Sequence, residues 1–95
     1  MSLKQAYEKK LRAQLDEWNS EIDRLKAKAD SAEADAQLEY YKHIEELRTR
    51  QEAAGAKLEA LENASEDAWE DLKAGVESAW DDLGQAIRAA ATRFK

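Results

Sequence analysis

The residue with the widest range of chemistry is His43, the only histidine among the 95 residues of the chain. Glu39 stands four residues before it and Glu46 stands three residues after it. On an α-helix these spacings bring the three side chains to one face, which would bind a metal ion only weakly. Bundles with dedicated carboxylate-bridged metals carry Glu-x-x-His motifs, and this sequence has none. We therefore expect a surface histidine, with no metal and no cofactor.

Nucleophiles and acid–base pairs are just as sparse. The chain has no cysteine, and none of its serines has a histidine at the spacing of a catalytic pair. Adjacent acids such as Glu70 and Asp71 point about 100° apart on a helix, so they do not form a general acid–base couple. The sequence predicts that the protein is not an enzyme.

The composition is typical of a long helix. Ala, Glu, Lys, Leu and Arg account for 57 of the 95 residues, and there are 3 glycines and no proline. That share exceeds the roughly 50% that marks coiled coils and long helices. Many of the apolar residues are alanines, which bury little surface, so a compact core within one chain is not expected. The fold class that we predict is all-α.

Charge and hydropathy limit the partners and the compartment. The net charge of −6 argues against a general nucleic-acid binder, which would present a basic face. The N-terminal residues lack the apolar core of a secretory signal, and no run approaches the ~18 apolar residues of a membrane span. We expect a cytoplasmic protein.

A heptad rhythm predicts how the helix associates. Apolar residues from Leu11 to Ala36 recur in alternating steps of four and three. Two successive steps of four, a stutter, follow at Ala36–Tyr40–Ile44, where local unwinding is expected. The four–three rhythm then continues across Gly55. This is the pattern of a coiled coil. We predict one long, nearly continuous amphipathic helix, about 140 Å in length at 1.5 Å per residue, that forms a homo-oligomeric coiled coil.

The last third of the chain is a repeat of eleven residues. The segments 62–72, 73–83 and 84–94 align, and the first two share Ala-Trp-acid-Asp-Leu. An eleven-residue repeat gives a straight or right-handed supercoil. We therefore interpret residues 1–95 as a single coiled-coil unit, with a mainly heptad part at 1–61 and three eleven-residue repeats at 62–94.

Two alternatives remain open for the path of the chain. A helical hairpin turning near Gly55 would pair into a four-helix bundle. Asn63 and Ser65, each followed closely by acidic residues, are also possible helix caps. The unbroken apolar phase favours the continuous helix over either break.

Charge patterning favours an antiparallel arrangement of the copies. Residues 1–12 carry four cations and one acid, whereas residues 59–82 carry nine acids and one lysine. A parallel pair would place acid beside acid, and an antiparallel pair avoids this. The residues that we expect at the oligomer interface are Leu11, Leu15, Trp18, Ile22, Leu25, Ile44, Leu47, Leu58, Leu61, Ala68, Trp69, Leu72, Val76, Trp80, Leu83, Ile87 and Phe94.

The segments KQAYEKKLRAQLDEWNSEIDRLKAKAD and ASEDAWEDLKAGVESAWDDL resemble a family of small bacterial coiled-coil proteins described as general stress-response proteins. The resemblance implies a bacterial, all-helical protein and brings no catalytic residues. The expected function is that of a structural or interaction protein, related to stress response, with an unknown protein partner besides its own copies. The alternative is a peripheral membrane- or lipid-binding protein acting through residues 62–95, because eleven-residue repeats also suit a helix lying on lipid.

Overall fold

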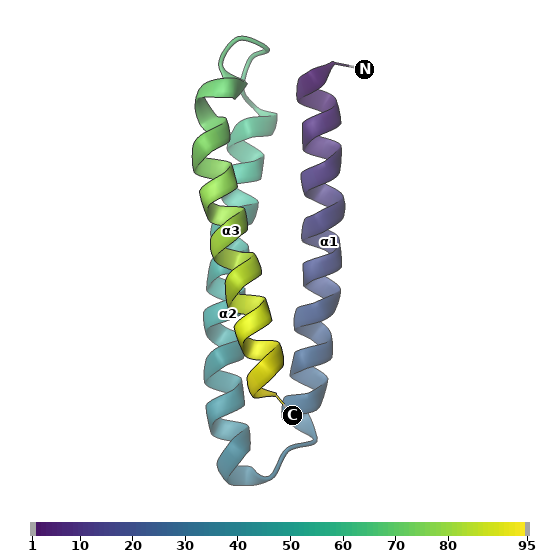
Figure 1. Cartoon of the computed structure of the whole chain (residues 1–95), viewed down its shortest axis with the longest axis vertical. Helices are drawn as coiled ribbons and strands as arrows, with labels where there is room; N and C mark the ends of the chain where they lie inside the picture. Colours follow the sequence, from purple (N-terminus) through teal and green to yellow (C-terminus); the bar gives the residue numbers. More distant parts are fainter. Residues whose placement is uncertain (1, 95) are drawn as a thin grey trace.

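Three helices form an elongated bundle in the computed structural model, which describes residues 2–94. Helix α1 (Leu3–Asp30) runs along one side, α2 (Ala34–Glu62) returns beside it, and α3 (Trp69–Arg93) runs in the direction of α1 (Figure 1). The bundle measures 51 × 20 × 18 Å along its principal axes. The prediction of an all-α protein is confirmed, since residues 2–94 contain no strand.

The prediction of one continuous helix is wrong. Turns at residues 31–33 and 63–68 fold the chain back on itself, so its longest dimension is 51 Å instead of about 140 Å. The turn of the alternative hairpin is also misplaced, because Gly55 lies within α2. The pairing of copies into a four-helix bundle stays a prediction.

The first turn is short and departs little from helical geometry. Ser31 ends α1 with a helical backbone (φ −91°, ψ −6°), and its N–H donates to the carbonyl of Lys28 at 3.2 Å. The N–H of Ala32 donates to the carbonyl of Ala29 at 3.1 Å. At Glu33 the backbone is extended (φ −65°, ψ 154°), and α2 begins at the next residue.

The second turn carries a recognisable cap. The hydroxyl of Ser65 accepts a hydrogen bond from the N–H of Ala68 at 3.1 Å, directly before α3 begins at Trp69. A serine that accepts from the N–H three residues later is typical of a helix start. The cap signal at Ser65 therefore marked a real break, which the continuous apolar phase concealed.

The apolar stripe forms a core within one chain, contrary to the expectation that a single chain would bury too little. Folding back lets the stripe of each helix face the other two, so the partner surface that a long helix would need comes from the same chain. Alanines contribute because their small side chains allow close approach of the helices. The buried hydrophobic residues are Leu11, Ile22, Leu25, Ala29, Ile44, Leu47, Ala54, Leu58, Leu61, Trp69, Val76, Trp80, Leu83, Ile87, Ala90 and Phe94.

Aromatic pairs tie α3 to the other two helices along its length. The ring centroids of Trp18 and Trp80 lie 6.3 Å apart, joining α1 to the middle of α3. At the C-terminal end of α3, Phe94 stacks on Tyr40 of α2 with a centroid distance of 4.3 Å. Each such pair contributes about 0.5–1.5 kcal/mol beyond its buried area, so α3 is fixed at both its middle and its end.

Candidate functional site

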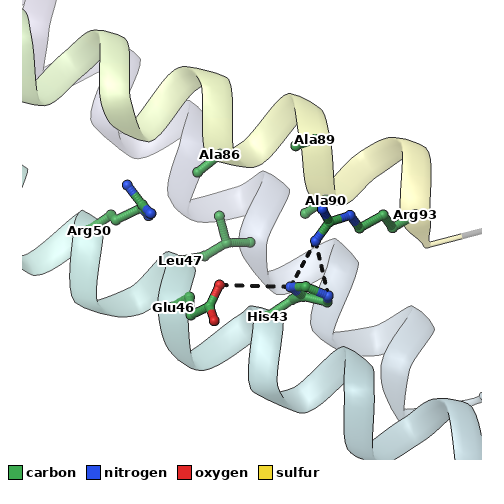
Figure 2. Close-up of a pocket in the computed structure, with 8 residues that line it drawn as sticks. All are labelled: His43, Glu46, Leu47, Arg50, Ala86, Ala89, Ala90 and Arg93. Carbon is green, nitrogen blue, oxygen red and sulfur yellow. Dashed lines mark hydrogen bonds and ion pairs between the residues drawn. The ribbon is translucent and has the colours of Figure 1, made fainter.

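His43 lies in a cleft between α2 and α3 and is not a solvated surface histidine. Its side chain is 16% exposed, because Arg93 from the last turn of α3 covers it. Figure 2 shows the guanidinium of Arg93 directed at the ring, with Nη1 3.2 Å from Nε2 and 3.4 Å from Nδ1. The cleft encloses about 210 Å³ above the small side chains of α3.

Carboxylates and an arginine–aspartate pair surround this cleft. Carboxylate oxygens of Glu39 and Glu46 lie 3.3 Å and 3.8 Å from the nitrogens of the His43 ring. Arg50, on the cleft wall, pairs with Asp82 of α3 at 2.5 Å. Within residues 2–94 no group of three or more potential metal ligands is assembled. The arrangement joins the end of α3 to α2 and offers no nucleophile beside the ring.

Most of the predicted interface residues lie in the core of the single chain. Thirteen of them are buried: Leu11, Ile22, Leu25, Ile44, Leu47, Leu58, Leu61, Trp69, Val76, Trp80, Leu83, Ile87 and Phe94. Leu15 and Trp18 are half-buried against that core. Ala68 and Leu72 are exposed: Ala68 belongs to the second turn, and Leu72 lies at the open edge of the seam between α2 and α3, beside Lys57 and Ala60.

The eleven-residue repeat is uneven in its burial. Leu83 and Phe94 occupy the repeat position of Leu72 and are 0% and 1% exposed, whereas Leu72 is 38% exposed. The second turn interrupts the first repeat, and the start of α3 packs through Trp69, which is 6% exposed, instead of through Leu72. A continuous eleven-residue packing pattern over 62–94 stays a prediction.

The basic N-terminal segment meets the acidic segment of the same chain. The guanidinium of Arg12 pairs with the carboxylate of Glu62, and the ammonium of Lys4 donates to the Glu62 backbone carbonyl at 3.0 Å. The hydroxyl of Tyr7 donates to Oε1 of Glu77 at 3.2 Å. Burial, together with the negative charge of Glu77 and this hydrogen bond, raises the pKa of Tyr7 to about 12. The charge complementarity that we expected between copies is therefore present within one chain.

An open groove remains where α1 and α2 join, which we call the junction groove. Figure 1 shows that α3 stops short of this turn, and the hydroxyl of Tyr40 donates to the carbonyl of Arg93 at 3.3 Å where α3 ends. The groove encloses about 710 Å³. Small and basic side chains predominate among the residues that line it: Arg24, Ala27, Lys28, Ser31, Ala32, Glu33, Ala36 and Tyr40.

Two side chains of α2 close the α1–α2 turn. The amide nitrogen Nε2 of Gln37 donates to the carbonyls of Ala29 and Asp30, at 3.2 Å and 3.3 Å. The hydroxyl of Tyr41 donates to the carboxylate of Asp30, and this hydrogen bond lowers the pKa of that carboxyl group. Sequence reasoning missed Gln37 and Tyr41, because their role is visible only once the position of the turn is known.

Comparison of the chain with protein-family models, with curated proteins and with solved structures finds no match. Among the helices of residues 2–94, none has the combination of length and apolarity that crossing a bilayer requires. The bundle, its junction groove and the turn beside that groove are therefore the features that bear on function.

Proposed function

We propose that the protein is a non-catalytic structural and interaction protein that binds a second copy of itself. The observation that supports this most directly is the junction groove, which α3 is too short to cover. Its small side chains at Ala27, Ala32 and Ala36 leave about 710 Å³ between α1 and α2. The distance between packed helices depends on side-chain size, so a groove of this kind accommodates another helix at close range.

The apolar stripe supports a helix of a second copy as the occupant of the groove. Ala32 and Ala36 continue the stripe of Leu25 and Ala29 past the end of α3, and Tyr40 marks the edge of the bundle core, where it stacks on Phe94. All three side chains are half-buried. A second copy carries the same stripe and meets this surface in antiparallel orientation, as α1 and α2 meet within one chain. An isologous contact of this type closes after two copies and does not extend into a filament.

Sedimentation velocity at increasing protein concentration tests this function. We expect a monomer at low concentration and a dimer at high concentration. Ala27→Glu places a charged side chain in the groove and should abolish the dimer, whereas Ala13→Glu, on an exposed part of α1, should leave it unchanged. A monomer at all concentrations would rule out the proposal.

The resemblance to small bacterial stress-response proteins points to the same class of function. Assembly of copies under stress requires no active site. Induced expression raises the protein concentration, and by mass action a higher concentration favours the dimer over the monomer. The stress concerned and any further protein partner are open to experiment.

A membrane surface is a second candidate because α3 is strongly amphipathic. Its buried side carries Trp69, Trp80 and Phe94, and aromatic residues of this kind anchor helices at a lipid interface. Its exposed side carries acids such as Glu70 and Asp81, which anionic lipid repels. Lys95, the last residue of the segment 62–95 that this alternative assigns to lipid binding, lies outside the described residues. If this candidate is correct, flotation should recover the protein with zwitterionic vesicles. Anionic vesicles should recover less of it.

A further inference from the structure

We propose that two copies associate by exchanging helices across the turn at Ser31–Glu33. In the exchanged form α1 and α2 of one chain become a single helix, and α1 of each chain packs against α2 and α3 of the other. This inference rests on the proposed self-association and specifies its mechanism. The partner is a second copy of this chain.

The first two residues of the turn keep helix-type backbone hydrogen bonds. Ser31 already has helical angles, and the N–H groups of Ser31 and Ala32 still bond to carbonyls of the last turn of α1. Glu33 is extended, but its φ of −65° is already a helical value, so rotation about ψ supplies most of the change. No described residue has a positive φ, and residues 26–37 contain no glycine and no proline.

The turn also lacks the local signals that stop and start helices. Helices often end at a glycine in the left-handed region, whereas α1 ends at Ser31 in a right-handed conformation. Glu33, at the start of α2, makes no side-chain capping bond. By contrast, Ser2 and Gln5 form a capping box at the start of α1, and Ser65 caps the turn that leads into α3. Asn63 also ends α2 in a right-handed conformation, and Ala68, directly before α3, makes no side-chain capping bond either. The second turn differs in its greater length, residues 63–68 against 31–33, and in the hydrogen bond to the Ser65 hydroxyl within it. The hinge is assigned to the first turn on these two differences.

Helix exchange preserves the contacts of the closed bundle. Asn19 bonds to Gln51 and Asp23 pairs with Arg48 between α1 and α2, and both contacts re-form between chains after exchange. The contacts that are specific to the closed turn are those of Gln37 with the carbonyls of α1 and of Tyr41 with Asp30. The junction groove, with its small side chains, lies where the two fused helices cross.

Proline at position 34 distinguishes the closed turn from the fused helix. Ala34 is the first residue of α2, a position where proline is well tolerated, and it follows the extended backbone that proline requires. In a fused helix the proline ring would clash with the carbonyl of Asp30 and would lack the N–H that the helix needs. With one proline in each chain, the association constant of Ala34→Pro should fall by about 10⁴-fold. The monomer should keep the helicity of the wild type.

Leu3→Pro is the matched control. Leu3 is the first residue of α1, follows an extended Ser2 and is 79% exposed. It begins a helix in both the closed and the exchanged form, so this proline should leave the association constant unchanged.

Gln37→Ala provides a second test that does not depend on how well the proline variant folds. It removes hydrogen bonds that are made only in the closed turn, and the association constant should rise about tenfold for the two chains together. Association constants of all variants are measured by sedimentation equilibrium.

The outcomes separate the two proposals. Weaker association of Ala34→Pro, with Leu3→Pro unchanged and Gln37→Ala strengthened, supports helix exchange. If the wild type and Ala34→Pro associate equally, or if Gln37→Ala associates no more strongly than the wild type, helix exchange is overturned and self-association stands. A wild type that is monomeric at every concentration overturns both.

Discussion

The indole of Trp18 lies directly over Gly84, so that a Cβ at position 84 would be 3.1 Å from Cζ2 of the Trp18 ring. This close approach brings α1 and α3 together where the Trp18 and Trp80 rings meet. Gly75 lies nine residues earlier on α3 and has no neighbouring atom within 4 Å of such a Cβ. The two glycines therefore have different reasons to be present.

Alanine at these two positions should have different effects on stability. Gly75→Ala should raise the free energy of unfolding by about 1 kcal/mol, because alanine has the higher helix propensity. Gly84→Ala should show a smaller gain or none, since the Trp18 ring must shift by a few tenths of an ångström to admit the Cβ. Urea denaturation followed by circular dichroism measures both. An equal gain for the two variants would mean that Trp18 does not pack on α3.

Aspartate substitutions should separate the two leucines of the eleven-residue repeat. Leu83 is fully buried, so Leu83→Asp loses about 1.5–3 kcal/mol of apolar burial and also buries an unpaired carboxylate. We expect this variant to be largely unfolded. Leu72→Asp, at a partly exposed position, should cost less than about 1 kcal/mol. Thermal melts check this, and comparable losses would contradict the three-helix packing.

Lys4 should contribute to stability although it is charged. Its side chain is 10% exposed, and its ammonium group bonds to Glu8 at 2.6 Å and to the last carbonyl of α2, that of Glu62, at 3.0 Å. A cation at this end of a helix also interacts favourably with the helix dipole. Lys4→Ala should lower the free energy of unfolding by about 1.5 kcal/mol. The control Lys9→Ala, at an exposed position of the same helix, should differ little from the wild type in chemical denaturation.

Stability should fall at alkaline pH because of Tyr7. Its pKa is about 12 in the folded chain and 10.0 when unperturbed, so the unfolded chain loses this proton first as the pH rises. The contribution of Tyr7 is therefore fully present below pH 10 and declines between about pH 10 and pH 12. Denaturation curves across this range should show a smaller decline for Tyr7→Phe. Parallel declines for the variant and the wild type would show that another group is responsible.

The apolar pattern of this chain predicted its helices but not their number. Both a coiled coil of long helices and a bundle of short ones use apolar residues in steps of three and four. The stripe from Leu25 through Ala32 to Ala36 stays in phase across the first turn, and the stutter begins only at Ala36, after the turn. Phase alone therefore could not reveal the break. Turn chemistry was the better guide at Ser65, whose hydroxyl does cap the turn before α3. At the first turn the sequence holds no comparable signal.

The sequence predicted the buried core residues better than the residues that close the first turn, for a physical reason. Leu11, Ile22 and Leu83 were identified as buried from periodicity, because any partner surface, within the chain or outside it, selects the same side of a helix. Gln37 and Tyr41 could not be found in this way. Their partners, Ala29 and Asp30, lie on the preceding helix and become neighbours only through the turn.

The central claim is that copies exchange helices at Ser31–Glu33. It is tested most directly by determining whether α1 contacts the α2 of its own chain or the α2 of the other chain in the dimer. The protein has no cysteine, so Asn19→Cys/Gln51→Cys supplies the only pair of thiols, at positions whose native side chains are hydrogen-bonded. The isolated dimer is treated with a short bis-maleimide and run on a denaturing gel. Arg50→Cys/Asp82→Cys is the control, because α2 and α3 remain in one chain in both forms. Helix exchange predicts a covalent dimer for the first pair and a monomer with an internal link for the control. A linked monomer for both pairs would contradict it.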